Sequence, residues 1–351
     1  MASSVGSKRV TLAQVAELAG VSVMTASYTY NRPDRVSDRA RSKVLTAAAQ
    51  LGYPGPDPSA RSLRRGSTRT LGVVMGEHLT YAFDDPEAVS FLAGIAEVCA
   101  DHGYGMTILP ITGAPDDVAR ITDAAVDGFV VWTTSDDDPI LGAVRAIQRP
   151  AAVHGGPAVP GLMLVSIDNR AAACAVGALA FAGARRPAVV SQPLSHDRIS
   201  TISAGTDVTD VSFPVTRERL EGYRQAAEAA GLAWCDVTVA VCAHNDEVEA
   251  ERVTATLLTS ADPPDAIAAM SDRQAAGVVR AVRAAGRVMP DDVAVTGWDD
   301  GAVAARLGLT TVAQSLRDQG AACAHAALGQ SADDHSAAWS VVRRESTRPP
   351  R

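Results

Sequence analysis

The sequence predicts a small all-α head followed by a larger, two-lobed α/β body with doubly wound parallel sheets. Residues 1–52 show short helical patterns, whereas from residue 70 onward buried-strand patterns alternate with helices of about 10–15 residues. The charge divides at the same place, because residues 1–70 carry a net +7 and the remaining residues carry −15. A basic head on an acidic body indicates a polyanionic partner for the head alone, the alternative being a basic surface without a partner.

The head has room for three short helices, each preceded by a hydroxyl residue that can cap its N-terminus. The caps are Thr11, Ser22 and Ser37, and the helices are expected to end near Ala19, Tyr30 and Gly52. Gly20 suits the tight turn between the first two helices, because glycine reaches positive φ without strain. A helix, a short turn and a second helix make the helix-turn-helix pattern, whose second helix enters the major groove of DNA.

Residues 53–69 are predicted to link the head (1–52) to the body (70–351). Their stretch "YPGPDPSARSLRRG" holds three prolines and two glycines, which is typical of a linker. Pro58 can nevertheless open one or two helical turns over "SARSLRR". So short a helix is marginal by itself and needs a surface to order it.

The body begins with the apolar run "TLGVVMG", which is typical of a buried parallel strand. Helical patterns such as "EAVSFLAGIAEVCADHG" and strand patterns such as "DGFVVWT" then alternate as far as "DVAVTGWDD". The body exceeds 250 residues, enough for two lobes with a cleft between them. Ligands of such sheets bind beyond the carboxyl ends of the strands.

Several classes of protein are disfavoured by missing patterns. No apolar run reaches 18 residues and no signal-peptide core is present, so we expect a cytoplasmic, nucleoid-associated protein without membrane contact. Five scattered cysteines without a CxxC motif give no reason to expect a disulfide framework or a metal site. The motifs GxSxG, HExxH and GxGxxG after the first strand, and the P-loop, are all missing, so we expect neither an enzyme nor a cofactor.

Three stretches of the head, "TLAQVAELAGVSVMTASYTYN", "VSDRARSKVLTAAAQLGY" and "PSARSLRRG", resemble the DNA-binding head of LacI/GalR-type bacterial transcription regulators. The motifs "TLGVVM", "VSIDNRAAA", "RLEGYRQAAEAAGL" and "VMPDDVAVTGWDD" follow in that family's order, so the resemblance spans about residues 8–328. It implies a periplasmic-binding-protein-like body and a homodimer that binds near-palindromic operator DNA as a repressor. A small polar effector such as a sugar would bind between the lobes and order or release the linker helices.

The resemblance also implies which residues of the head meet DNA. Val23, Met24 and Tyr28 occupy positions that meet base edges, whereas other positions meet phosphates: Ser22, Thr25, Ser27 and Asn31. The family usually has Arg at the position of Tyr28, and tyrosine can make only one hydrogen bond or stack on a thymine methyl. The alternative is that Val23, Met24 and Tyr28 pack within the head.

In the linker, Ala60 and Leu63 match positions that face the minor groove, where a leucine can wedge between base steps. Arg61 would neutralise a phosphate. The alternative is a flexible tether without DNA contacts.

Seven side chains are candidates for the effector cleft: Phe83, Trp132, His154, Arg219, Ser271, Asp299 and Gln314. Arg219 matches a family arginine that holds ligand hydroxyls or carboxylates, Asp299 can accept hydrogen bonds from sugar hydroxyls, and Ser271 stands where the family often has Asn. Each has a structural alternative. Asp299 can cap a helix, Arg219 can form an ordinary salt bridge, Trp132 can belong to the core and His154 can be a structural hydrogen-bond donor.

The sequence leaves two other functions open. The first is a sugar-binding protein of periplasmic type without a DNA role, although the basic head and the missing signal peptide argue against it. The second is a regulator of the same fold that is controlled by a protein partner or by no ligand. Aromatic residues make up only 4% of the chain, and sugar sites often use aromatic platforms, so this second alternative remains.

Overall fold

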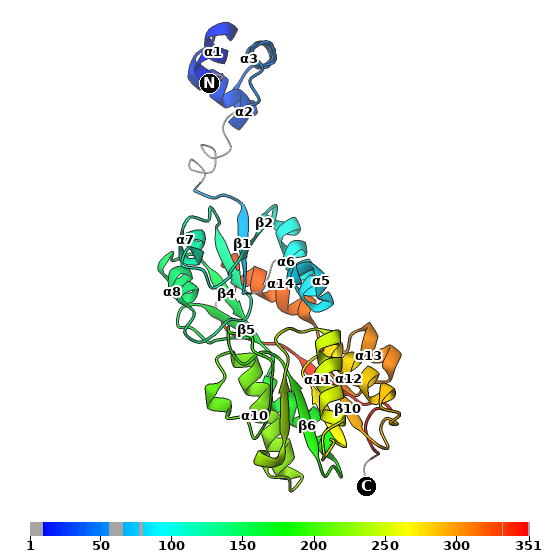
Figure 1. Ribbon diagram of the computed structural model, residues 1–351. Helices are drawn as coiled ribbons and strands as arrows, with labels where there is room; N and C mark the ends of the chain where they lie inside the picture. The colour runs from blue at the N-terminus through cyan, green and yellow to red at the C-terminus, as the bar shows by residue number, and fades with distance from the viewer. Residues whose placement is uncertain (1–9, 56–65, 77–79, 332, 350–351) are drawn as a thin grey trace, which may run out of the picture. The chain divides into compact units, whose positions relative to one another are not determined.

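The computed structural model describes residues 10–55, 66–76, 80–331 and 333–349 (Figure 1). The chain divides into two compact units, Met1–Thr68 and Arg69–Arg351. Each unit has a hydrophobic core of its own. No helix among the described residues is long and apolar enough to cross a membrane.

The head holds three α-helices, α1 (Leu12–Ala19), α2 (Val23–Asn31) and α3 (Asp38–Leu51), with a short 3₁₀ turn at Pro33–Arg35. Their N-caps are the three predicted hydroxyl residues: Thr11, Ser22 and Ser37. Gly20 ends α1 with a φ of 66°, which turns the chain into α2.

A small apolar core holds these three helices together. It contains Val15 from α1, Ala26 from α2 and Val44 from α3, none of which is exposed. The small side chain of Ala26 lets the short helix α2 approach its neighbours while its other faces remain free.

The first lobe of the body is a six-stranded parallel sheet in the order β12-β5-β4-β3-β1-β2. Its strands are β1 (Thr70–Met75), β2 (Gly105–Pro110), β3 (Gly128–Val131), β4 (Ala151–His154), β5 (Met163–Ser166) and β12 (His335–Ser336). Its helices are α5 (Tyr81–Asp84), α6 (Pro86–His102), α7 (Asp117–Thr122), α8 (Pro139–Ala146) and α14 (Leu316–Ala327).

Helices α6 and α14 lie side by side in the first lobe although they are far apart in the sequence (Figure 1). Glycines allow this approach, since a Cβ on Gly94 would lie 1.9 Å from the carbonyl oxygen of Arg317. A Cβ on Gly320 would likewise lie 2.1 Å from the carbonyl oxygen of Phe91. The C-terminal part of the chain is therefore built into the first lobe.

The second lobe is a five-stranded sheet in the order β10-β9-β6-β8-β7. Its strands are β6 (Pro187–Ser191), β7 (Thr201–Ala204), β8 (Thr238–Val241), β9 (Ala266–Ala269) and β10 (Ala294–Thr296). Its helices are α9 (Asn169–Phe181), α10 (Pro214–Ala229), α11 (Glu247–Leu258), α12 (Asp272–Ala284) and α13 (Ala302–Leu307), with 3₁₀ turns at Val208–Asp210 and Trp234–Asp236. A separate antiparallel pair, β11 (Thr311–Gln314) with β13 (Trp339–Val342), lies against this lobe.

The chain passes between the lobes three times. It leaves the first sheet after β5, returns between β11 and α14, and leaves again between β12 and β13. The segment between β11 and α14 is a single residue, Ser315. These three crossings place the ends of several strands next to the opposite lobe.

The predicted fold class, a helical head on a two-lobed body of mostly parallel sheets, is confirmed. Two antiparallel pairings were not predicted, β7 with β8 and β11 with β13. Strand β7 is exposed along its whole length, so its sequence carries no burial signal. The edge position explains this, because only one side of the strand pairs with a neighbour.

Candidate functional site

Helix α2 presents two large apolar side chains to solvent. Val23 is 52% exposed and Met24 is 64% exposed, whereas Ala26 and Thr29 of the same helix are buried. Tyr28 is half-buried. For Val23 and Met24 the alternative of packing inside the head therefore does not hold, and both side chains remain available for contact with another molecule.

The polar side chains of α2 hold one another in place. The Ser22 hydroxyl lies 2.9 Å from that of Thr25 and accepts a hydrogen bond from the Thr25 amide. Asn31 donates to the Ser27 carbonyl and hydroxyl at 3.0 and 3.2 Å. Five exposed basic residues follow in the sequence: Arg32, Arg35, Arg39, Arg41 and Lys43. Hydroxyls, amides and cations are the groups that contact phosphate oxygens in DNA complexes.

The proposed linker contacts Ala60, Arg61 and Leu63, with Pro58, fall in residues 56–65, outside the described residues.

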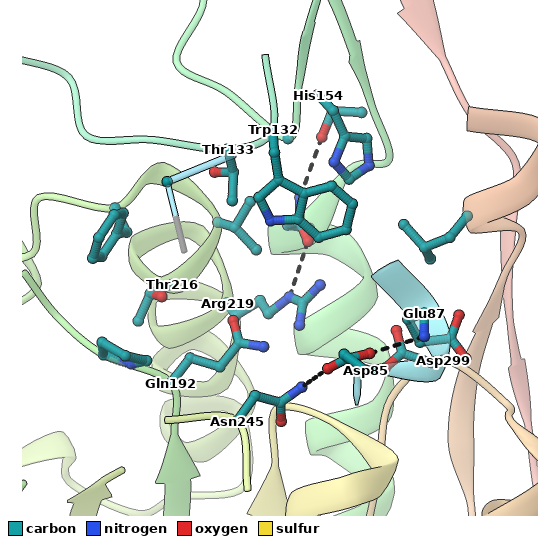
Figure 2. Close-up of a pocket in the computed structure, with 18 of the residues that line it drawn as sticks. Asp85, Glu87, Trp132, Thr133, His154, Gln192, Thr216, Arg219, Asn245 and Asp299 are labelled. Carbon is teal, nitrogen blue, oxygen red and sulfur yellow. Dashed lines mark hydrogen bonds between the residues drawn. The ribbon is translucent and has the colours of Figure 1, made fainter. Parts of the chain in front are cut away.

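The body contains a cavity of about 120 Å³ to which both lobes contribute side chains (Figure 2). The first lobe contributes residues at the ends of β3 and β4 and on α6 and α14: Trp132, Thr133, His154, Asp85, Glu87, Leu316 and Gln319. The second contributes residues that follow β6, β8 and β10, end β11 or lie on α9 and α10: Gln192, Asn245, Asp299, Gln314, Asn169, Thr216 and Arg219. As the fold class predicts, the cavity lies at carboxyl ends of parallel strands.

Polar contacts join the two lobes beside this cavity. Asn245 of the second lobe donates to Asp85 Oδ2 of the first at 2.8 Å, and Arg273 lies 3.5 Å from the same oxygen. At another edge Arg217 forms an ion pair of 2.6 Å with Asp136. Because each contact joins one lobe to the other, any opening of the cleft breaks them.

Arg219 projects from α10 into the cavity and is only 7% exposed. It donates to Asn169 Oδ1 at 3.0 Å and to the Met270 carbonyl at 2.7 Å. Its guanidinium also lies 3.9 Å from the centre of the Trp298 ring, an arrangement that favours a cation. These partners fix the guanidinium plane in the wall of the cavity.

An aromatic cluster forms the first-lobe wall. The rings of Phe91, Trp132 and His154 are mutually within 4.7–4.9 Å of one another, centre to centre. Trp132 is half-buried and lines the cavity, so it is both a packing residue and a surface for a ligand. Burial lowers the pKa of His154 to about 4, so its ring is neutral at pH 7.

Carboxyl groups gather on the opposite side. Burial, followed by the charges of Asp85 and Asp272, raises the pKa of Glu87 to about 7. Burial also raises the pKa of Asp272 to about 6, although Thr311 and the Gly301 amide donate hydrogen bonds to it. Burial and the charges of Glu87 and Asp272 raise the pKa of Asp299 well above its ordinary value.

Asp299 has a backbone φ of 107°, which is rare for any residue other than glycine. Its amide donates to the Val312 carbonyl at 2.8 Å, and its Oδ1 accepts from Gln314 at the same distance. The N-cap of the following helix α13 is Gly301, so Asp299 does not have the alternative role of a helix cap. Strained backbone that aims a carboxylate into a cavity is typical of binding sites.

Five of the seven candidate cleft residues line the cavity: Trp132, His154, Arg219, Asp299 and Gln314. The other two do not. Phe83, on the short helix α5, is 64% exposed. Ser271 is buried as the N-cap of α12, and its hydroxyl donates to Asn245, so it supports a lining residue from behind.

Sequence reasoning missed several lining residues, among them Asp85, Glu87, Gln192, Asn245 and Gln319. Gln192 and Asn245 follow strands β6 and β8, so the strand-end rule could have found them. Asp85 and Glu87 lie at the start of α6, where acidic residues are common because they cap the helix, so nothing in the sequence indicated that they line a cavity. In the described part of the chain, no group of His, Cys, Asp and Glu side chains is arranged to hold a metal ion.

An exposed helix-turn-helix surface and a cavity enclosed by two α/β lobes define a DNA-binding protein that responds to a small molecule. Residues 11–55 match the family of bacterial regulatory proteins of lacI type, and residues 176–348 match a periplasmic-binding-protein-like domain. The HTH-type transcriptional regulator Rv3575c of Mycobacterium tuberculosis is 36% identical over 319 residues, 89% of each chain.

Two solved structures agree with this assignment. A LacI-family transcriptional regulator from Corynebacterium glutamicum has a TM-score of 0.73 at 27% identity, covering 97% of this chain and 100% of that one. The complex of the regulator CelR with cellobiose has a TM-score of 0.66 at 26% identity, covering 96% and 100%. The chain belongs to the LacI family of bacterial regulatory proteins. It is a DNA-binding transcriptional regulator and not an enzyme, as the sequence predicted.

Proposed function

We propose that this regulator is a cytoplasmic homodimeric repressor that binds near-palindromic operator DNA and responds to an uncharged, hydroxyl-rich effector such as a sugar. The observation that carries the effector class is the chemistry of the cavity. Its walls combine carboxylate and amide groups, which accept hydrogen bonds from hydroxyls, with the apolar face of Trp132. The CelR complex with cellobiose supports the same class.

The proposed contacts to the effector come from both lobes. Asp299 and Glu87 accept hydrogen bonds from ligand hydroxyls, Arg219 and Asn245 donate to ligand oxygens, and Trp132 covers an apolar face of the ligand. A ligand held in this way joins the two lobes and stabilises the arrangement that includes the Asn245–Asp85 contact. Stabilising one lobe arrangement is how a ligand shifts a conformational equilibrium.

The proposed contacts to DNA come from α2. Val23, Met24 and Tyr28 meet base edges, chiefly by apolar contact with thymine methyl groups, and the polar residues of α2 meet phosphates: Ser22, Thr25, Ser27 and Asn31. The exposure of Val23 and Met24 supports this assignment. Ala60, Arg61 and Leu63 retain their proposed contacts to the centre of the operator.

A thermal-shift screen of the full chain against monosaccharides, disaccharides and polyols tests the effector. A binding compound is expected to raise the melting temperature by several degrees, because it binds only the folded state. The variant Asp299→Asn should lose most of that shift. The matched control Glu97→Gln, an exposed acidic residue on α6 that does not line the cavity, should keep it.

Selection of bound duplexes, with and without the stabilising compound, tests the DNA function and the direction of control. The proposal expects one preferred near-palindromic duplex whose affinity falls when the compound is added. Sedimentation of the free and DNA-bound protein gives the number of subunits. A protein that no hydroxyl-rich compound stabilises, and whose duplex binding no compound alters, contradicts the proposed effector class.

A further inference from the structure

A continuous row of hydrogen bonds crosses from one lobe to the other along the edge of the cavity. His154 Nε2 lies 3.1 Å from Gln319 Oε1, Gln319 Nε2 donates to Gln314 Oε1 at 3.2 Å, and Gln314 Nε2 donates to Asp299 Oδ1 at 2.8 Å. His154 and Gln319 belong to β4 and α14 of the first lobe. Gln314 and Asp299 belong to the second, and the step between the two glutamines spans the crossing at Ser315.

The direction of this row follows from its last member. Asp299 Oδ1 accepts the hydrogen bond from Gln314 Nε2, as an oxygen without a proton must, so the amide nitrogen of Gln314 faces Asp299. Its amide oxygen then faces Gln319, which must donate and in turn present its own oxygen to His154. The imidazole must therefore carry its proton on Nε2. A neutral imidazole has one proton, so Nδ1 is left as an acceptor.

Two further observations agree with this direction. Burial lowers the pKa of His154 to about 4, so the ring is neutral at pH 7 and only one of its two nitrogens carries a proton. Among the described residues His154 Nδ1 is buried and has no hydrogen-bond partner. A single hydrogen bond, the one from Nε2 to Gln319, therefore decides the tautomer of this ring.

The row also has an alternative direction. If Asp299 carries a proton on Oδ1 it can donate, both amides can turn over, and His154 Nε2 then becomes the acceptor at the far end. The balance depends first on the burial of Asp299, which favours its protonation, and then on the charges that face it. Glu87 on α6 and Asp272 on α12 also favour protonation, whereas Arg219 on α10 favours ionisation.

We propose that His154, Gln319, Gln314 and Asp299 form a polarised hydrogen-bond chain that couples the charge of Asp299 in the second lobe to the tautomer of His154 in the first. Gln314 and Gln319 are positioning residues in this arrangement. An effector hydroxyl that donates to Asp299 holds it as an acceptor and so fixes the direction of the whole chain. This last step rests on the proposed function, whereas the chain itself exists without a ligand.

The coupling has a consequence for the response to an effector. The His154 ring packs at a tilt against Trp132 and Phe91, and Phe91 lies on α6 against α14, so the His154 end of the chain lies in the packed centre of the first lobe. The first lobe is the one whose strand β1 directly follows the linker in the sequence. A change of polarity at Asp299 therefore reaches the part of the body nearest in sequence to the DNA-binding head.

Nitrogen NMR of the histidine rings tests the proposal on the full chain without effector or DNA. Long-range proton–nitrogen spectra of protein labelled with ¹⁵N-histidine distinguish the two tautomers, and the His154 signals are those missing from His154→Asn. At pH 7.5 the wild-type ring is expected as the Nε2–H tautomer, with the other form below about a tenth.

Asp299→Asn is the decisive variant. Asparagine keeps the shape of aspartate and tolerates positive φ, but its amide can either donate or accept, so the direction of the chain is no longer fixed. The two directions of the chain then have similar free energies, so we expect the Nδ1–H tautomer of His154 to rise to about half of the population. Gln319→Leu should have the same effect, and adding Asp299→Asn to it should change nothing more.

The control is Gln192→Leu, because Gln192 lines the same cavity but has no place in the chain. It should leave the His154 spectrum unchanged. If Gln319→Leu does not fold, Gln314→Met breaks the chain from the second lobe and gives the same comparison.

A wild-type ring protonated on Nδ1, or an unchanged His154 spectrum in folded Asp299→Asn, overturns the proposal. Neither result depends on whether the effector is a sugar. A screen in which no sugar binds leaves the tautomer result intact, so the two proposals fail separately.

Discussion

The two recognition surfaces of this regulator are built in opposite ways. Helix α2 and its N-cap Ser22 carry the candidate contacts within ten consecutive residues, and Val23 and Met24 extend into solvent. The cavity of the body collects side chains from Asp85 to Gln319, most of them partly or fully buried, with carboxyl groups whose pKa values are raised. Single substitutions can alter the surface of α2 without disturbing the rest of the head. The shape and charge of the cavity, in contrast, depend on packing throughout both lobes.

The largest expected difference between the two surfaces is their response to salt. Contacts between basic side chains and phosphates release counterions, so operator affinity should fall about 10³-fold between 50 and 200 mM salt. Binding of an uncharged effector in the cavity should change less than about twofold, because it releases few ions. Fluorescence anisotropy and calorimetry measure the two affinities. Equal salt dependence at both surfaces would contradict the contrast.

Arg219→Ala should cause the next largest effect, and only in the body. The variant leaves Asn169 Oδ1 and the Met270 carbonyl without their donor and removes the cation that lies on Trp298. Each buried acceptor left without a donor costs about 1–3 kcal/mol in free energy of unfolding. Urea unfolding followed by circular dichroism measures the destabilisation, with Arg252→Ala, an exposed arginine on α11 outside the cavity, as the control.

Glu87→Gln should change how stability depends on pH. Burial raises the folded-state pKa of Glu87 to about 7, so its carboxyl ionises at lower pH in the unfolded chain. The wild-type body therefore loses stability as pH rises from about 5 to 8, and the variant should recover on the order of 2 kcal/mol at pH 8. Melting temperatures across this range report the effect. If Glu87→Gln and the exposed Glu97→Gln have the same pH profile, the buried carboxyl is not responsible.

Two capping serines offer a matched comparison of smaller effects. Ser22 caps α2 at the surface, whereas Ser271 caps α12 in the interior and also donates to Asn245. Ser22→Ala should destabilise the head by about 1 kcal/mol, the usual value for an exposed cap. Ser271→Ala should destabilise the body by about 2 kcal/mol, because the cap of α12 is lost in the interior and a half-buried acceptor on Asn245 loses its donor. Separate unfolding transitions of the two units give both values.

The smallest expected effect on stability comes from the surface of α2. Replacing Val23 and Met24 together by serine should change the free energy of unfolding by less than about 0.5 kcal/mol, since both side chains are exposed. The selected operator should nevertheless change at the half-site positions that these residues contact. An unchanged half-site would show that they do not read bases.

The sequence predicted the head better than the cavity for a physical reason. Caps, helix ends and the turn at Gly20 depend on residues a few positions apart, and the structure has the three predicted N-caps. Helices and parallel strands of the body were also predictable from their apolar patterns. The exposed strand β7 was not, because its residues have no buried face.

The cavity was predicted in part. Residues at strand ends, such as Trp132 and His154, were found because the carboxyl ends of parallel strands meet at one edge. Glu87 and Gln319 were missed since both lie on helices, where a polar residue is usually explained by solvent. Ser271 was predicted to contact the effector but lies behind Asn245, which lines the cavity in its place. Residue spacing in the sequence does not show which of two neighbouring polar side chains reaches the cavity wall.

Because the chain crosses between the lobes three times, only some parts of this protein can be exchanged with those of related regulators. One cut near Thr68 separates the head from everything that follows, so a chimera can exchange heads between related regulators at a single junction. Neither lobe is a continuous stretch, because the first combines residues before Ile167 with residues after Ser315, and the second combines residues before Ser315 with residues after β12. Exchange of a sensor must therefore transplant the body whole, which allows operator specificity and effector specificity to be inherited as two independent modules.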